Sequence, residues 1–329
     1  MKKMTMGMLI ASGICMIGGT SLMVAGIASG GSVGLQVTKN GIRTADDIEE
    51  MEEVIEDLQN AKKLILNVEG MRVDVSEGDE FAVTWRYRED EYEIEKTQKG
   101  DTTSITVRQK KQPETYVSMF GMGSYPEDSG IYVTIPKDQK LDSLEIVNDY
   151  ETVVIAGVHT SALKVISESG SVTCEKVWAD EAVFQNSGGQ IYGERLQGKT
   201  LATTTEAADV SFDDAEFGTW TAKTEGGQIT GNKITVQKAD VQAEDGSIDL
   251  EKLDADDVRA VSGTGDIYVN LYDDLQEYHL KLFTKYGEIY VDDADVMEED
   301  GMDGEYERNP DAEKSIELRS REGAINLVQ

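Results

Sequence analysis

The residues best placed to do chemistry are acidic side chains that recur at one interval in the middle of the chain. Glu175, Glu194 and Asp213 lie 19 residues apart, and the positions after them hold Lys176, Arg195 and Asp214. Carboxylates stacked about 4.8 Å apart could supply oxygen ligands to Ca²⁺, with the arginine near the sugar acids of a polysaccharide lyase substrate. The alternative is a charge-compensated solvated face, because opposite charges on neighbouring strands stabilise one another.

The other reactive residue types form no recognisable catalytic or metal-binding motif. His159 and His279 lie in different repeats, and neither belongs to a Ser/His/Asp or Cys/His set. Cys174 falls in an inward apolar position and Cys15 in an apolar run, so the two cysteines offer no disulfide framework. We therefore predict a protein that is not an enzyme, with no catalytic residues, no cofactor and no specific metal site.

A second candidate cation site is the acidic segment 292–313, which holds eleven acidic residues and one base, Arg308. If Gly301 is the central glycine of a calcium loop, the first ligand position falls on Val296, which has no side-chain oxygen. The stretch Ser262 to Asp266 is similar to one unit of a nonapeptide calcium roll, but it occurs once. Weak, unspecific cation binding is the remaining expectation.

These residues belong to a repeat that runs from Leu144 to Tyr272. An aliphatic β-branched residue recurs every 19 positions, at Val153, Val172, Ile191, Val210, Ile229, Ile248 and Ile267. Around it, apolar and polar residues alternate with a period of two, as in a half-buried strand. One unit has too little apolar surface to fold alone, so the units must stack. The pattern predicts an all-β fold, a parallel β-solenoid with 19-residue coils.

A turn column lies two residues before each aliphatic residue. Because glycine tolerates a left-handed backbone, we predict structural turn glycines at Gly170, Gly189, Gly227, Gly246 and Gly265. Two further coils, at Gly287 and Gly323, follow after steps of 22 and 36 residues, and the acidic insertion 292–313 is expected to be a solvated loop. A column of small polar residues from Asn148 to Ser262 precedes the turns and should hydrogen-bond from coil to coil.

The first part of the chain indicates a membrane anchor. No charged residue occurs from Met4 to Thr38, and the apolar run from Met6 to Ala28 would span ~34 Å as a helix. Lys2 and Lys3 favour an amino end inside the cell and the bulk of the chain outside. A cleaved signal peptide is the competing interpretation. Residues 1–34 are thus predicted to be a single-pass anchor with a juxtamembrane joint.

Residues 35–63 are predicted to contain a short amphipathic helix, with apolar residues from Ile48 to Leu58 on one stripe and acidic residues on the other. It could cover the first coil of the solenoid or pair with a partner helix. The solenoid domain is predicted to span 64–329, with an early coil at Leu64 to Val75. The loop from Tyr116 to Tyr125 is either a contact surface or packs against the solenoid flank.

Composition restricts the classes of partner. The formal net charge of −33 repels nucleic acid and anionic lipid, so we predict no nucleic-acid binding. The hydrophobic fraction of 39% is sufficient for a globular core.

Several phrases carry a family resemblance: the apolar N-terminal segment, the strand Leu64 to Val75, Ile131-Tyr132-Val133-Thr134-Ile135-Pro136-Lys137, and Leu141-Asp142-Ser143-Leu144-Glu145-Ile146. Together they resemble the bacterial putative-adhesin family of membrane-anchored β-strand-repeat proteins. The resemblance implies a right-handed solenoid on the cell surface, a domain of undetermined function often found in envelope-stress settings, with no catalytic residues to carry over. The acidic insertion and the step of 22 depart from even repetition.

The function predicted from the sequence is therefore a non-enzymatic cell-envelope protein with an adhesin-like binding or scaffolding domain. Its partners would be the membrane, through the N-terminal helix, and a protein or a cell-wall polysaccharide. A link to envelope-stress signalling is a further expectation from the resemblance. The alternative is a carbohydrate-active β-helix enzyme, similar to a polysaccharide lyase.

Overall fold

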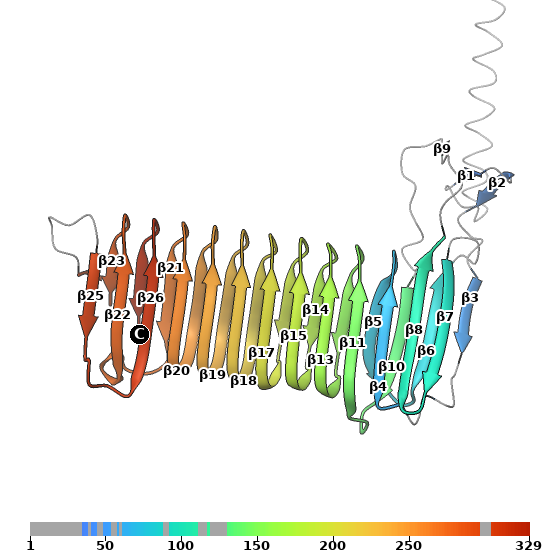
Figure 1. Ribbon diagram of the computed structural model, residues 1–329, viewed down its shortest axis with the longest axis horizontal. Helices are drawn as coiled ribbons and strands as arrows, with labels where there is room; N and C mark the ends of the chain where they lie inside the picture. The colour runs from blue at the N-terminus through green and yellow to red at the C-terminus, as the bar shows by residue number, and fades with distance from the viewer. Residues whose placement is uncertain are drawn as a thin grey trace, which may run out of the picture. The chain divides into compact units, whose positions relative to one another are not determined.

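The computed structural model describes residues 35–38, 41–44, 49–53, 58, 61–87, 92–110, 117–118, 130–296 and 304–329. The chain divides into two compact units. The smaller contains an antiparallel sheet of β1 (Leu35–Thr38), β2 (Gly41–Thr44) and β9 (Val117–Ser118). The other strands join one mixed sheet of 24 strands, shown in Figure 1. The prediction of an all-β fold is confirmed.

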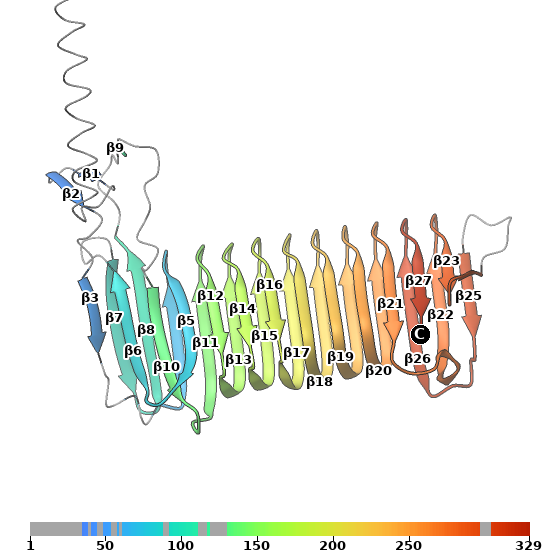
Figure 2. The ribbon, with the colours of Figure 1, turned by 180° about the vertical axis from the view of Figure 1, so that it is seen from behind.

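The middle of the large sheet alternates a long segment with a short segment, and each kind of segment forms its own parallel ladder (Figures 1 and 2). Among the long segments Leu144 pairs with Leu163, and among the short ones Val153 pairs with Val172. Partners are thus 19 residues apart in the sequence. The strands are β11 (Leu141–Asn148), β12 (Val153–Ala156), β13 (His159–Ser167), β14 (Val172–Glu175), β15 (Trp178–Asn186), β16 (Ile191–Glu194), β17 (Gln197–Thr205), β18 (Val210–Thr224), β19 (Ile229–Ala243), β20 (Ile248–Ser262) and β21 (Ile267–Leu271). The two kinds of segment are separate strands up to β17 and run together in the 15-residue strands β18, β19 and β20.

The core lies between the two ladders, where the alternating apolar residues point inward. All seven members of the Val153 column are buried. The largest side chains fill the middle coils: the Phe212 ring lies 6.4 Å from Phe184 and makes an edge contact of 6.0 Å with Trp220. Gly193 and Gly231 flank Phe212 in the same column, and a Cβ at Gly193 would lie 2.7 Å from the Phe212 ring. The missing side chains provide the room for this aromatic cluster.

The predicted polar column forms hydrogen bonds from coil to coil. Asn148 Nδ2 donates to the carbonyl oxygen of Met71 at 2.8 Å, and Asn186 Nδ2 donates to that of Gly170 at 2.8 Å. Ser167 and Thr205 donate to carbonyl oxygens in their own turns, at 3.0 Å each. These buried side chains satisfy carbonyl groups at the bends, where the sheet ladder is interrupted.

The turn glycines have a different role from the one predicted. Among the described glycines, Gly70, Gly100 and Gly157 have a positive φ, and the seven turn glycines do not. Instead, their backbone passes very close to the neighbouring turn. A Cβ at Gly246 would lie 1.9 Å from the carbonyl oxygen of Gly227, and one at Gly265 would lie 2.3 Å from that of Gly246. Lack of space, not a left-handed backbone, requires glycine there.

At the N-terminal end of the ladders, the predicted early coil is β4 (Lys63–Val68) and β5 (Arg72–Gly78). Leu64 pairs with Leu144 and Val73 with Val153, so this coil adjoins β11 and β12. On its other side, β8 (Thr102–Gln109) and β10 (Gly130–Pro136) pair with β4 and β5, also in parallel. The connecting strands are β6 (Ala82–Tyr87) and β7 (Tyr92–Lys99), and β7 is antiparallel to β8.

The C-terminal coils do not stack in chain order. The last coil, β26 (Lys314–Ser320) and β27 (Ile325–Val328), lies between β20–β21 and the earlier coil of β22 (Tyr278–Thr284) and β23 (Ile289–Val291). Ile316 pairs with Val258 on one side and with Leu280 on the other. The acidic insertion contributes β24 (Ala294–Asp295) and β25 (Gly304–Arg308), and β25 is antiparallel to β22. The short 3₁₀ helix η2 (Leu275–Glu277) precedes β22.

Two helix predictions have different outcomes. The amphipathic helix from Ile48 to Leu58 is wrong over its described part, because β3 (Glu49–Glu53) is a strand of the large sheet. Backbone pairing in a sheet overrides the helical preference of a glutamate-rich segment. The predicted membrane helix from Met6 to Ala28 lies outside the described residues. Within the described ranges, no helix has the length and hydrophobicity needed to cross a bilayer.

Candidate functional site

The predicted carboxylates lie at the corner between the short strands and the long strands. Glu175 pairs with Glu194 and Glu194 with Asp213, so the three side chains stand on adjacent strands. The residue after each carboxylate turns the corner with a left-handed backbone: φ is 53° at Lys176, 56° at Arg195 and 56° at Asp214. Because of this conformation, the side chains of Lys176 and Arg195 lie next to the carboxylates that precede them.

Basic side chains neutralise two of the three carboxylates. Arg195 Nη2 lies 2.6 Å from Glu175 Oε1 and 3.0 Å from Glu194 Oε1, and Lys176 Nζ lies 3.2 Å from Glu175 Oε1. The hydrogen bond from Lys176 is the main cause that lowers the pKa of Glu175, with further lowering by Arg195. Asp213 instead accepts a 2.7 Å hydrogen bond from Asn232 Nδ2. The corner is therefore an ion-paired surface.

This geometry favours neither of the two chemistries considered for the column, calcium binding and polysaccharide lysis. A general acid needs a raised pKa, whereas the pKa of Glu175 is lowered. A calcium site needs six to eight oxygen ligands, and no group of three or more His, Cys, Asp and Glu residues in the described part of the chain is arranged to hold a metal ion. The charge-compensated face is the interpretation that these distances favour.

The other reactive residues lie on three different strands, His159 on β13, Cys174 on β14 and His279 on β22, and each makes contacts of its own. His159 stacks on Trp178 with ring centroids 6.3 Å apart, and His279 Nε2 lies 2.8 Å from Glu307 Oε1. Cys174 is buried in the core, where desolvation raises the pKa of its thiol. The predicted contact loop is described only at Val117–Ser118, and the calcium loop considered around Gly301 is described only at Val296 and from Gly304 onward, where Glu307 lies on β25 beside His279.

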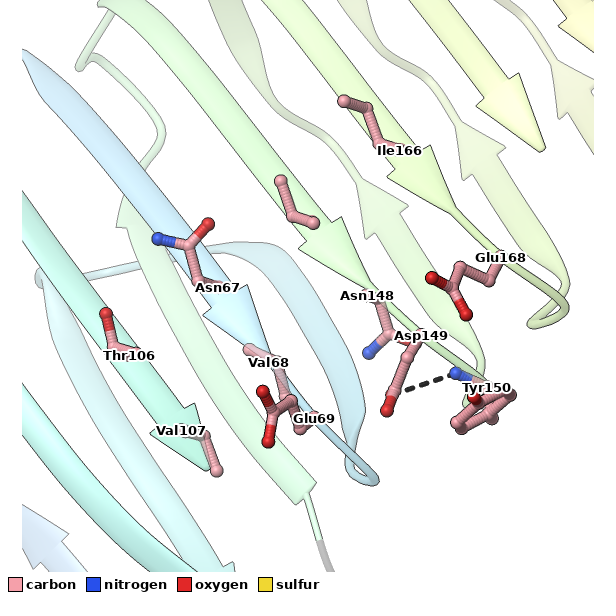
Figure 3. A pocket seen from close by; sticks show the side chains of 11 residues that line it. Asn67, Val68, Glu69, Thr106, Val107, Asn148, Asp149, Tyr150, Ile166 and Glu168 are labelled. Atoms are coloured by element: carbon pink, nitrogen blue, oxygen red, sulfur yellow. Dashed lines mark hydrogen bonds between the residues drawn. The ribbon is translucent and has the colours of Figure 1, made fainter. Parts of the chain in front are cut away.

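Sequence analysis missed a pocket of about 360 Å³ at the turn edge of the first coils, shown in Figure 3. Val147, Ile166 and Tyr150 line it, and 64% of the surface of Tyr150 is exposed. Glu69, Asp149 and Glu168 add carboxylates to the lining. The signal in the sequence was an outward column that is polar at Gln185 and Thr204 but aliphatic at Val147 and Ile166.

The sequence of this chain matches one known protein family over most of its length. A family model described as Toastrack DUF4097 matches residues 61–328. The chain belongs to this family. The match covers the parallel ladders and both of their ends, so the out-of-order coils lie within the Toastrack region. The resemblance to a β-strand-repeat family of undetermined function is thereby confirmed.

Two solved structures are similar to this Toastrack chain. One is a "putative cell adhesion protein" of Clostridium sporogenes, 15% identical, which covers 86% of this chain and 100% of its own, with a TM-score of 0.25. The other is a "putative adhesin" of Bacteroides fragilis, 10% identical, which covers 86% of this chain and 97% of its own, with a TM-score of 0.39. At TM-scores below 0.5, neither likeness supports a conclusion about function. No curated protein matches the sequence.

Proposed function

We propose that this Toastrack protein is a non-enzymatic, adhesin-like protein of the cell envelope, whose repeat domain binds or scaffolds a protein or a cell-wall polysaccharide. The observation that carries the proposal is the pair of parallel ladders, which holds outward side chains in fixed columns about 4.8 Å apart. Such a surface is preorganised, so a repetitive or extended partner can bind without ordering a flexible site.

The test is co-sedimentation of the detergent-solubilised full chain with insoluble cell-wall polysaccharide and, in parallel, with immobilised envelope proteins. Saturable binding that leaves the polymer intact supports the proposal. Absence of saturable binding to either class of partner would contradict it.

The second candidate function is a polysaccharide lyase that uses the corner column of Glu175, Glu194 and Asp213. The stacking of these carboxylates on adjacent strands favours it, whereas the ion pairs of Arg195 and Lys176 oppose it. Incubation of the full chain with polyuronides, with and without Ca²⁺, separates the two functions. Depolymerisation that Asp213→Ala abolishes would establish the enzyme and end the non-enzymatic proposal.

The proposed location is the cell membrane, and the sequence of the first residues supports it. The uncharged run from Met4 to Thr38 after Lys2 and Lys3 supports a single membrane span, with the Toastrack region outside the cytoplasm. In the full chain carrying Cys15→Ser, a cysteine in place of the exposed Lys223 should react with a membrane-impermeant maleimide in intact cells. Labelling only after lysis would place the domain on the cytoplasmic side.

Two finer features belong to the same proposal. The ladder register supports 19-residue coils, and we expect them to wind in the right-handed sense that the resemblance implies. A link to envelope-stress signalling is a separate hypothesis. It predicts that the full-length chain co-purifies with a membrane signalling partner from detergent extracts of stressed cells.

A further inference from the structure

The pocket lies at two neighbouring turns, one with a glycine and the other with a tyrosine in the equivalent position. Val68 pairs with Asn148 and Val73 with Val153, so the two turns have the same length and Gly70 takes the position that Tyr150 holds in the next turn. Gly70 adopts a φ of 68°, and a Cβ there would face Tyr92 and Gln109, neither of which lines the pocket. The pocket lies next to these turns, and its lining includes Val107 at the end of β8, Glu69 and Tyr150 (Figure 3).

Two aliphatic side chains give the lining of the pocket an apolar part. Val147 and Ile166 are paired neighbours on β11 and β13, and both point outward from the sheet and remain partly exposed. Their column holds Asn67 on one side and Gln185 on the other. With the exposed ring of Tyr150, these residues offer a hydrophobic strip that can cover the methylene groups of a bound side chain.

Carboxylates line the pocket without the basic neighbours found at the corner. Asp149 Oδ1 accepts hydrogen bonds from the backbone N–H groups of Gly70 at 2.8 Å and of Tyr150 at 2.9 Å. Glu69 Oε2 accepts one from the N–H of Gln109 at 3.2 Å. Within the described ranges, the backbone N–H of Glu168 is hydrogen-bonded but its side-chain carboxylate has no hydrogen-bond or ion-pair partner, and no lysine or arginine lines the pocket. Its charge is uncompensated.

We propose that this pocket binds a lysine or arginine side chain of an extended partner peptide. The stem of the side chain would lie along Val147 and Ile166, and its cationic group would reach the carboxylates of Asp149 and Glu168. Tyr150 would add a cation–π contact. A volume of about 360 Å³ accommodates one such side chain together with part of the adjoining backbone. The inference rests on the proposed binding function and names a partner class for it.

The experiment is calorimetric titration of the detergent-solubilised full chain with the peptide acetyl-Gly-Lys-Val-Lys-Gly-amide. The peptide acetyl-Gly-Gln-Val-Gln-Gly-amide is the uncharged control. The test variant is Tyr150→Ala with Glu168→Gln. The matched variant is Tyr286→Ala with Glu225→Gln, because Tyr286 is also an exposed turn tyrosine (61%) and Glu225 is a turn glutamate away from the pocket. Both variants lose one negative charge and one aromatic ring.

The expected result is saturable binding of the lysine peptide alone, weakened at least tenfold in the test variant and changed less than twofold in the matched variant. Equal weakening in both variants would show general attraction to a chain of charge −33 and would overturn the inference. Absence of saturable binding would also overturn it. If glucosamine displaced the peptide, the pocket would bind an amino sugar rather than a peptide side chain, and the inference would be overturned too. If polysaccharide co-sedimentation persists in these cases, the proposed function stands without the peptide pocket.

Discussion

At the scale of single residues, successive turns lie so close together that one position in each turn has no room for a side chain. Gly226 and Gly227 are adjacent, yet they meet different surroundings. A Cβ at Gly227 would lie 2.0 Å from the carbonyl oxygen of Ala208, whereas one at Gly226 would find its nearest atom, the carbonyl oxygen of Glu206, at 3.7 Å. Close approach of neighbouring turns thus demands glycine at the second position and tolerates a methyl group at the first.

We therefore predict that Gly227→Ala lowers the free energy of unfolding by about 2 kcal/mol, since the ladder must open to admit the methyl group. The change Gly226→Ala should alter the same quantity by less than about 0.5 kcal/mol. Urea unfolding of both variants, followed by circular dichroism, measures the difference. Equal destabilisation by the two substitutions would be incompatible with the close approach.

At the scale of elements, the position of β26 is supported by charge. One outward column runs through Asp240, Arg259, Glu317, Lys281 and Glu307 in the order of the strands, so its sign alternates at every step. Arg259 lies 3.0 Å from Asp240. Stacking in chain order would instead set Arg259 beside Lys281, which costs free energy because like charges on neighbouring strands repel. The out-of-order coil removes this repulsion.

Glu317→Lys should destabilise the C-terminal coils by roughly 1 kcal/mol at low ionic strength, because it places a third positive charge between Arg259 and Lys281. The matched change is Glu216→Lys, whose ladder neighbours are the uncharged Gln197 and Thr235. Unfolding in urea at low and at high salt measures both effects. A penalty at Glu317 that does not shrink with salt would argue against the charge column.

A lysine at the start of β26 and a buried tyrosine at the start of β22 stabilise the same coil. Lys314 Nζ lies 2.6 Å from Asp273 Oδ2, 3.3 Å from Glu277 Oε2 and 5.3 Å from the centre of the Tyr278 ring. The hydrogen bond to Asp273 is the first cause that raises the pKa of Lys314. Tyr278 donates a 2.7 Å hydrogen bond to the carbonyl oxygen of Ala255, and burial raises the pKa of its phenol to about 12.

This tyrosine predicts a loss of stability at alkaline pH. Because the pKa of the folded state exceeds the ordinary value of 10, the contribution is complete below pH 10 and disappears as the pH rises through about 12. Tyr278→Phe should lower stability by ~1 kcal/mol at pH 8, through the lost hydrogen bond, but should flatten the pH dependence above pH 10. Urea unfolding at pH 8, 10 and 11 measures it. Parallel pH profiles of the two proteins would contradict this assignment.

The sequence allowed prediction of some elements and not of others. The columns through Val153 and Asn148 were predictable, because inward side chains and turn residues repeat with the coil. The stacking order was not, since every coil carries the same inward pattern whichever coil adjoins it. The strand at Glu49–Glu53 was missed because sheet pairing, not local propensity, decides it. The pocket was missed because its lining residues, such as Val107 and Tyr150, come from separate coils that only strand pairing brings together.

At the scale of the whole Toastrack region, the two ends of the stacked array have the same arrangement of strands. The first coil, β4 and β5, lies between two other coils, and so does the last, β26 and β27. Each end is then covered by an antiparallel strand, β7 on β8 and β25 on β22. The coils that come first and last in the sequence are thus paired on both sides, which opposes fraying. The antiparallel strands protect the outer edges of the parallel ladders from further pairing.

The most direct test of this account is a disulfide that reports the stacking order. Val261 pairs with Arg319, and Arg319 pairs with Phe283, so Val261 and Phe283 are two strands apart, about 9.6 Å. In the full chain with Cys15→Ser and Cys174→Ala, the pair Val261→Cys and Arg319→Cys should form an intramolecular disulfide on mild oxidation. The pair Val261→Cys and Phe283→Cys should not, because its separation exceeds the 7 Å limit for a disulfide. Peptide mapping by mass spectrometry that found the opposite result, a bridge between positions 261 and 283 alone, would contradict the inserted coil.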